Sequence, residues 1–170
     1  LRHVSNIKNV YKLPCVVAVN RFPTDTDNEI DFIIEKCKEL GVNVVLSTVW
    51  ANGGNGGIDL AKEVVRLCEE EDNSNFTFSY ETESSIEEKI EAVVTKVYGG
   101  DGIEFTTNAK KQLDQLKEDG FGSLPVCIAK TQYSFSDDMT KLGAPEGFTV
   151  TVRNVKVSAG AGFIVALTGE

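Results

Sequence analysis

Short apolar runs alternate with longer amphipathic segments along the first half of this chain. Residues 15–20 and 42–49 are almost continuously apolar, which is typical of strands buried on both faces of a parallel sheet. Residues 126–129 have the same character. Since helix-length segments follow the first two runs, the order is strand–helix–strand–helix. We therefore expect an α/β fold, Rossmann-like or P-loop-NTPase-like, with one parallel core sheet that contains all three strands.

Apolar positions at helical spacing predict the helices. Residues 1–11 are expected to be the end of a helix, and further helices are expected at residues 27–40, 58–71, 84–97 and 108–119. Thr26 or Asp27 is placed to cap the second of these, and Ser84 or Ser85 begins a capping box with Glu87 or Glu88. Alternating residues predict a short strand at 76–80 and strand structure at 148–157, with a last strand at 163–167.

These elements suggest a division of the chain. We expect residues 1–145 to form an α/β region, with a helical subregion at about 84–120, and residues 146–170 to begin a β-containing carboxy-terminal segment. The chain has no initiator Met and its last strand pattern ends close to Glu170. We expect it to be a fragment of a longer protein.

Composition narrows the classes of partner. The net charge of −9 and the pI near 4.7 argue against a nucleic-acid partner, because phosphate binding needs a basic surface. No apolar stretch approaches the roughly 20 residues of a membrane-spanning helix. The four cysteines form no CxxC pair or zinc spacing, and we expect reduced core thiols and a cytoplasmic protein. They are Cys15, Cys37, Cys68 and Cys127. His3 is the only histidine, and neither a Ser-His-Asp set nor a metal cluster is apparent.

Polar loops with aromatic residues follow the predicted strands. Asn20 begins the loop after the first strand, Trp50 follows the second, and Lys130 begins the loop after residues 126–129. Ligands of open α/β sheets bind beyond the carboxyl ends of the strands, so one composite site is expected there. Phe22 and Trp50 could form a slot for a flat heterocycle. The alternatives are an ordinary loop at Asn20, a Trp50 that caps the core and a solvated Lys130.

Two further patterns are weaker indications of a nucleotide or anion site. Asn20-Arg21-Phe22-Pro23 is similar to the Asn-Lys-x-Asp base-reading loop of GTPases, but Pro23 stands where the acidic residue is needed. The glycine-rich residues 53–57 could offer backbone N–H groups to an anion. They lack the Gly-Lys-Ser/Thr of a P-loop, so we expect them to supply flexibility and positive φ angles instead.

Several long strings together resemble formate–tetrahydrofolate ligase. The resemblance runs in order over essentially the whole chain, and it is carried by residues 17–26, 50–54, 98–105, 124–136, 143–145 and 157–163. The stretch Gln132-Tyr133-Ser134-Phe135 is more similar to the bacterial monofunctional form than to the eukaryotic multifunctional one.

The resemblance implies a reaction and its substrates. Members of the family join formate to tetrahydrofolate with MgATP, through formyl phosphate, and release ADP and phosphate. A monovalent cation, a homotetramer and a cytoplasmic location are implied as well. The family's P-loop lies in an amino-terminal domain that these residues do not include, so the catalytic groups are expected outside this chain and the chain alone is expected to be inactive.

The resemblance also assigns roles to residues at matching positions. It implies that Phe22 and Trp50 sandwich the pterin ring, with Pro23 beside them. Asn20, Lys130 and Gln132 are expected to line the site. The nucleotide-side residues are expected to be Ala144, Pro145, Ser158 and Gly160. No resident metal is implied.

Two other functions stay open on the sequence alone. The similarity of Asn20-Arg21 to a base-reading loop would suit a purine-nucleotide switch domain, although Pro23 counts against it. A non-catalytic scaffold that keeps only the ligase fold is the second alternative.

Overall fold

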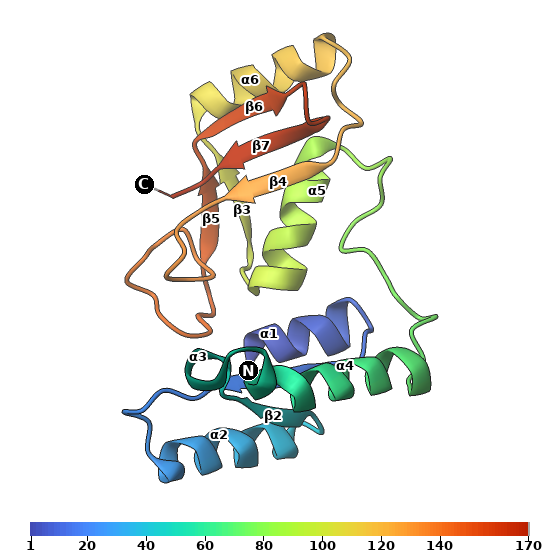
Figure 1. The fold of residues 1–170 in the computed structure, drawn as a ribbon. Helices are drawn as coiled ribbons and strands as arrows, with labels where there is room; N and C mark the ends of the chain where they lie inside the picture. The colour runs from blue at the N-terminus through green and yellow to red at the C-terminus, as the bar shows by residue number, and fades with distance from the viewer. Residues whose placement is uncertain (170) are drawn as a thin grey trace. The chain divides into compact units, whose positions relative to one another are not determined.

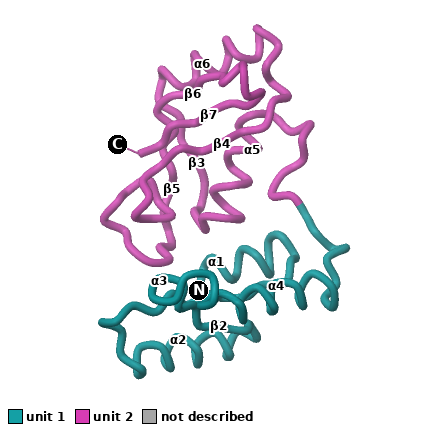
Figure 2. Tube along the Cα trace, viewed as in Figure 1, with its two compact units in different colours: residues 1–77 teal, residues 78–170 magenta. Residues whose placement is uncertain are grey.

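The computed structural model describes residues 1–169, and the chain forms two compact units (Figure 2). Unit 1 spans Leu1–Thr77, and unit 2 begins at Phe78. The mixed α/β class with parallel strands and a β-rich carboxy-terminal segment is confirmed. The predicted boundary at 145/146 falls inside unit 2 and stays a prediction about domain organisation.

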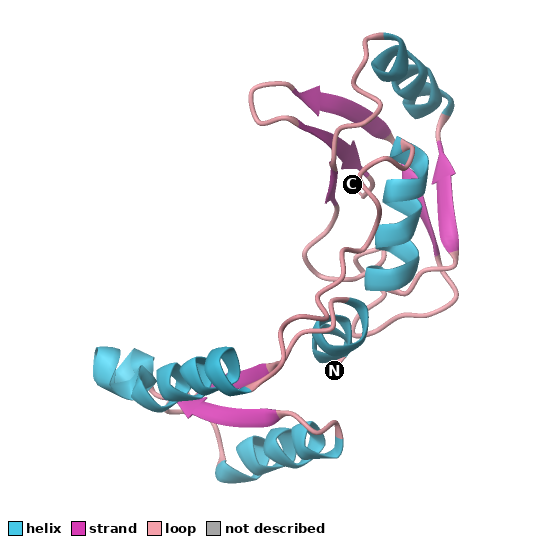
Figure 3. Ribbon diagram, turned by 90° about the vertical axis from the view of Figure 1, so that its right-hand side faces the viewer, coloured by secondary structure: helices cyan, strands magenta, loops and turns pink. Residues whose placement is uncertain are grey.

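Unit 1 is a small parallel sheet between helices (Figures 1 and 3). Strands β1 and β2 pair in parallel, with Val16 opposite Asn43 and Asn20 opposite Ser47. Helix α2 packs on β2, and α4 contacts both strands. The elements are α1 (Arg2–Ser5), η1 (Asn6–Val10), β1 (Val16–Asn20), α2 (Asp27–Glu39), β2 (Asn43–Ser47), α3 (Val49–Asn52), η2 (Gly53–Gly57) and α4 (Ile58–Glu70).

Local signals set the ends of α2. The Thr26 hydroxyl accepts from the backbone N–H of Glu29, and the Glu29 carboxylate accepts from the backbone N–H of Thr26. This reciprocal capping box satisfies two N–H groups that the first helical turn leaves without partners. Gly41 follows the helix with φ +62°, a conformation that costs glycine little. The predicted start and end of this helix are confirmed.

Two predictions for unit 1 are wrong. The apolar spacing of residues 58–71 predicts a helix with Ala61, Val64, Val65 and Cys68 facing inward. Helix α4 has no buried residue, and Val64 and Val65 are 44% and 52% exposed, because a two-stranded sheet covers little of the apolar face of a helix. Residues 76–80 do not form a strand. The Thr77 backbone N–H donates to the Tyr11 carbonyl and the Phe76 ring stacks on Tyr11, so the end of η1 holds this segment instead.

Unit 2 contains two sheets and two longer helical segments. Strands β3 and β5 form a parallel pair, while β4, β7 and β6 form a three-stranded sheet in which β4 and β7 are parallel and β6 is antiparallel. The elements are α5 (Ile86–Ala92), η3 (Val93–Tyr98), β3 (Gly102–Phe105), α6 (Thr107–Glu118), β4 (Val126–Ala129), β5 (Thr149–Val152), β6 (Asn154–Ser158) and β7 (Phe163–Leu167).

The core of unit 2 lies between α5, α6 and the sheets. Helix α6 packs on β6, and α5 contacts β3 and β4 (Figure 1). Ile86, Ile90 and Val94 point into this core at helical spacing and are fully buried, as their pattern predicts. Gly100 lies so close to Phe148 that an added Cβ would be 3.0 Å from its carbonyl oxygen, which explains a glycine between η3 and β3.

The expectation of one sheet through β1, β2 and β4 is wrong. Strand β4 pairs with β7 in unit 2, whereas β1 and β2 pair with each other in unit 1. The expected burial of these strands on both faces is also wrong, since Ala18 in β1 and Cys127 in β4 are exposed. A continuous apolar run carries no information about the partner strand. Residues 148–157 form two strands, β5 and β6, that belong to different sheets, and β3 was not predicted from the sequence.

The cysteines are only partly in the core. All four are free thiols, and Cys37 is buried while Cys15 is half-buried. Cys68 and Cys127 are exposed, so the prediction that they lie in the core is wrong. In β4, exposure alternates along Val126–Ala129, which leaves Cys127 on the outer face. Burial raises the pKa of the Cys15 thiol because it disfavours the thiolate.

The capping box of α5 gives a stability prediction. The Ser85 hydroxyl accepts from the backbone N–H of Glu88, whose carboxylate in turn accepts from the Ser85 N–H. Ser85→Ala should lower the free energy of unfolding of unit 2 by about 1 kcal/mol, the usual effect of losing a helix cap. Denaturation followed by circular dichroism measures this. Ser84→Ala is the matched control, and an equal loss in both variants would contradict the capping role.

Candidate functional site

The loop after β1 is held by its own polar residues. The Arg21 backbone N–H donates to the Ser47 carbonyl at 2.9 Å, which continues the β1–β2 pairing by one residue. The Arg21 guanidinium forms an ion pair with Asp27 at 2.7 Å. The Phe22 backbone N–H donates to the Asp25 carboxylate at 2.7 Å. These contacts fix the backbone that carries Phe22, while its ring is 44% exposed.

The turn that carries Trp50 is supported by the glycine-rich segment. The Thr48 backbone N–H donates to the Gly56 carbonyl at 3.1 Å, and a Cβ added to Gly56 would lie 2.4 Å from the Thr48 carbonyl carbon. Only glycine permits this approach. Gly53 adopts φ +56°, as expected for a segment that supplies unusual backbone conformations. The segment therefore positions the short helix α3 on which Trp50 lies.

Phe22 and Trp50 come together at one edge of the unit 1 sheet. Both follow the carboxyl ends of parallel strands, and their ring centroids are 5.9 Å apart with an interplanar angle of 57°. The predicted proximity of these two rings is confirmed. Trp50 is 66% exposed, so it does not cap the core of unit 1 as the alternative required. Pro23 is exposed beside Phe22, and Asn20 is exposed at the end of β1.

Lys130 lies in unit 2, so a shared sheet does not bring it to this edge. Its ammonium donates to the carbonyls of Thr131, at 2.9 Å, and Ser134. It also lies 5.1 Å from the Tyr98 ring centroid and 5.9 Å from that of Phe135. Burial lowers the pKa of Lys130, because desolvation disfavours the charged form. Lys130 is therefore not the solvated lysine of the alternative reading.

The remaining candidate residues also belong to unit 2. Ser158 ends β6 and Gly160 lies in the β6–β7 turn, next to the amino ends of β7 and β4. Lys130 and Gln132 follow the carboxyl end of β4, so these two pairs lie at opposite ends of the three-stranded sheet. Ala144 and Pro145 lie in the long connection between β4 and β5, and Ala144 is exposed.

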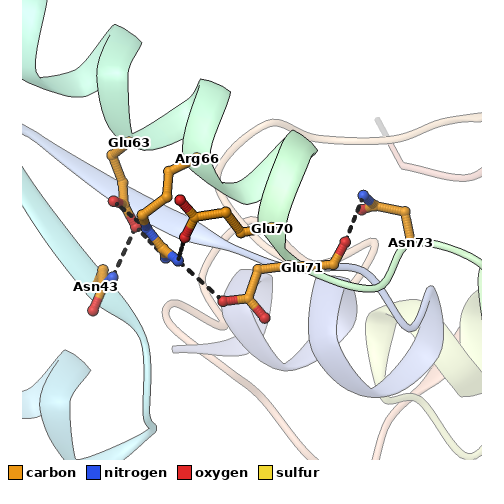
Figure 4. Close-up of polar contacts among 6 residues, drawn as sticks. All are labelled: Asn43, Glu63, Arg66, Glu70, Glu71 and Asn73. Atoms are coloured by element: carbon orange, nitrogen blue, oxygen red, sulfur yellow. Dashed lines mark hydrogen bonds and ion pairs between the residues drawn. The ribbon is translucent and has the colours of Figure 1, made fainter.

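A polar cluster between α4 and β2 was missed by sequence reasoning (Figure 4). Arg66 donates to both oxygens of Glu63 at 2.9 Å and also contacts Glu70 and Glu71. The Asn43 side chain donates to Glu63 at 2.8 Å, which ties α4 to β2. The i, i+3 spacing of Glu63 and Arg66 was a signal for this pair, but nothing in the sequence indicated Asn43.

Because of these contacts, we expect unit 1 to lose stability when the pH becomes acidic. Hydrogen bonds from Arg66 and Asn43 lower the pKa of Glu63 to about 2, from an ordinary value of 4.5. A lowered carboxylate pKa contributes stability above the unfolded-state pKa, and this contribution is lost as pH falls through the folded-state value. Glu63→Gln should therefore destabilise unit 1 at pH 7, and the difference from wild type should shrink between about pH 4.5 and pH 2.

Trp50 fluorescence reports this unfolding, because it is the only Trp and lies in unit 1. Glu69→Gln, an exposed change on the same helix, is the control and should show no such pH dependence. A constant difference between Glu63→Gln and wild type from pH 7 to pH 2 would contradict the assignment.

The Phe22–Trp50 pair lies beyond the carboxyl ends of parallel strands, where α/β proteins bind ligands, and aromatic side chains commonly line such ligand sites. The chain belongs to the formate–tetrahydrofolate ligase family, since the model of that family matches residues 1–170. The family carries out the ATP-dependent ligation of formate to tetrahydrofolate, so the substrates are small molecules of one-carbon metabolism. The match favours the ligase over the purine-nucleotide switch domain.

Two features are absent from the residues that the structure describes. In residues 1–169, no helix has the length and apolar character needed to cross a membrane. Within the same residues, no group of three or more His, Cys, Asp and Glu side chains is arranged to hold a metal ion.

Proposed function

We propose that unit 1 supplies the pterin side of the folate site in a formate–tetrahydrofolate ligase. In this proposal Phe22 and Trp50 stack on the two faces of the pterin ring, and Pro23 lies against its edge. The observation that carries the proposal is the exposed pair of rings, 5.9 Å apart, at the carboxyl edge of the β1–β2 sheet. The family match supplies a flat heterocyclic substrate for that slot.

The geometry requires the rings to move when the ligand enters. A flat ring between two others needs centroids about 7–8 Å apart, since carbon atoms in contact are about 3.5–4.0 Å apart. The tilted pair at 5.9 Å closes the slot. Phe22 and Trp50 are 44% and 66% exposed, so rotation of the side chains opens the slot without unfolding the core. The hydrogen bonds that hold both loops keep the backbone in place during this change.

The finer features of the reaction belong to the same proposal. The ligase would act through formyl phosphate, with MgATP and a monovalent cation, as a cytoplasmic homotetramer of the bacterial monofunctional type. Asn20, Lys130 and Gln132 are proposed to line the site. The proposed nucleotide-side residues are Ala144, Pro145, Ser158 and Gly160.

A pair of phenylalanines in unit 1 tests the proposal. Phe22→Ala in the full-length enzyme should raise the Kd of tetrahydrofolate about tenfold, because a stacked ring contributes about 0.5–1.5 kcal/mol beyond its burial. Phe32→Ala is the matched control, since Phe32 is 60% exposed on α2 in the same unit. Calorimetric titration measures both values. Equal affinities in the two variants would refute the pterin slot.

The 170 residues alone should not make 10-formyltetrahydrofolate. Phosphoryl transfer needs a loop and cations around the γ-phosphate, and the sequence contains no Gly-x-x-x-x-Gly-Lys-Ser/Thr segment. Product formation from formate, MgATP and tetrahydrofolate is the measurement, with the full-length enzyme as positive control. Turnover by the pure 170-residue chain would contradict the expectation that the phosphate-binding loop lies outside these residues.

A further inference from the structure

Phe22 is the first residue of a tight turn that spans residues 22–25. The backbone N–H of Asp25 donates to the Phe22 carbonyl at 3.0 Å, and the backbone N–H of Phe22 donates to the Asp25 carboxylate at 2.7 Å. Pro23 occupies the second position, where its fixed φ suits a β-turn. The two hydrogen bonds run in opposite directions, so the same pair of residues closes the turn twice.

The chain is anchored on both sides of this turn. Before it, the Arg21 backbone N–H donates to the Ser47 carbonyl at 2.9 Å and extends the β1–β2 pairing. After it, the capping box of Thr26 begins α2. Only residues 22–25 lie between these fixed points, so the closure of the turn determines the direction in which the backbone presents the Phe22 ring.

Asp25 contributes more to this closure than the neighbouring ion pair does. Its side chain is half-buried, and a hydrogen bond from a backbone N–H to a carboxylate is stronger than one between neutral groups. The Arg21–Asp27 pair is 37% and 79% exposed, and an exposed ion pair contributes little because water and salt screen it. Without the Asp25 carboxylate, the Phe22 N–H would lose its hydrogen-bond partner and the turn would keep one closing bond.

The orientation of Phe22 matters because the pterin slot needs both rings. The Phe22 ring centroid lies 5.9 Å from that of Trp50, and the ring is 44% exposed, so packing holds it less firmly than a core side chain. When only a fraction of the molecules has a binding-competent conformation, the apparent affinity falls by that fraction. We propose that Asp25 is a positioning residue of the pterin slot, which holds Phe22 beside Trp50 through the hydrogen bond from the Phe22 N–H. This inference rests on the function proposed for unit 1.

Two other roles for Asp25 predict different behaviour. In a purely structural role, Asp25→Ala would lower the melting temperature of unit 1 and leave the Kd of tetrahydrofolate unchanged in the folded fraction. A direct contact between Asp25 and the ligand would raise the Kd to the same extent with and without the Phe22 ring. A positioning role raises the Kd only when the Phe22 ring is there to be positioned.

The test is a double-mutant cycle in the 170-residue chain, with Trp50 fluorescence as the reporter of tetrahydrofolate binding. Asp25→Ala should raise the Kd about threefold to tenfold, and no more than Phe22→Ala does, because Asp25 acts through the Phe22 ring. In the Phe22→Ala background, the same substitution should change the Kd less than about twofold. Circular dichroism melts give the folded fraction of each variant at the temperature of the titration.

Two single variants separate the hydrogen bond from the charge. Asp25→Asn loses the charge but keeps an acceptor oxygen, so its Kd should stay within about twofold of wild type. Asp31→Ala makes the same change in net charge at an exposed position of α2 and should bind like wild type. A Kd as high in Asp25→Asn as in Asp25→Ala, or an equal rise in Asp31→Ala, would overturn the positioning role.

The cycle also distinguishes failure of this inference from failure of the pterin slot. If Phe22→Ala weakens binding and Asp25→Ala does not, the positioning role is wrong and the slot stands. An equal rise of the Kd on Asp25→Ala with and without the Phe22 ring would likewise overturn the positioning role alone. An unchanged Kd in Phe22→Ala would refute the slot itself, and the positioning role with it.

Discussion

Trp50→Ala in an active ligase that contains these residues should raise the Kd of tetrahydrofolate about tenfold to hundredfold. The indole face contributes stacking of about 0.5–1.5 kcal/mol beyond its burial, and alanine also loses apolar contact area, for a total of roughly 1–3 kcal/mol. The affinity for ATP should change far less, since stacking on the pterin does not involve the nucleotide. Trp50→Phe should recover part of the loss, because a smaller ring still stacks.

Stability separates this outcome from a structural role. Trp50 is 66% exposed, so its removal should leave the melting temperature almost unchanged. Titration of tetrahydrofolate into the Ala and Phe variants, beside a thermal melt of each, gives both quantities. An unchanged Kd together with a large fall in melting temperature would assign Trp50 to the core and remove one wall of the pterin slot.

Of the variants proposed for stability measurements, Lys89→Ala should have the largest effect. It should lower the free energy of unfolding of unit 2 by roughly 2–5 kcal/mol. Lys89 is fully buried, and its ammonium donates to the carbonyls of Ser123 and Leu124 at 2.8 and 3.1 Å. Alanine removes the packed aliphatic stem and leaves two carbonyls without their donor. Burial is the main cause of the lowered pKa of Lys89, and Glu83 opposes the shift.

Two variants divide this loss into its parts. Lys89→Met retains most of the stem and removes only the donor, so it should cost roughly 1–3 kcal/mol. Lys110→Ala, an exposed change on α6, should remain within about 0.5 kcal/mol of wild type. Chemical denaturation followed by circular dichroism measures all three. Equal stability of Lys89→Met and wild type would contradict a stabilising role for the two hydrogen bonds.

The sequence predicted local features of the fold well because their causes are local. The capping residues Thr26 and Ser85 lie within one turn of the groups that they satisfy. The apolar spacing of Ile86, Ile90 and Val94 is set by helix geometry alone. Lys89 lies three residues after Ile86, on nearly the same helix face, so its burial was readable in principle from that spacing.

Features that depend on distant partners were not predicted. The pairing of β4 with β7 joins residues almost 40 positions apart, and no property of the β4 run selects that partner. The exposure of Cys127 follows from this pairing and from the outer face of the strand. For the candidate site, the Phe22–Trp50 pair was predicted because both rings follow adjacent parallel strands. The separate place of Lys130 in unit 2 was not, since it depends on the pairing of β4 with β7.

The most direct test of the pterin slot uses the fluorescence of Trp50 in the 170-residue chain, where it is the only tryptophan. Tetrahydrofolate is titrated into the chain, with correction for its own absorbance, and Phe22→Ala and Phe32→Ala are titrated in parallel. The account predicts saturable quenching of Trp50, weakened by Phe22→Ala and unchanged by Phe32→Ala. Absence of saturable quenching, or the same quenching curve in all three proteins, would contradict the claim that these two rings bind the pterin.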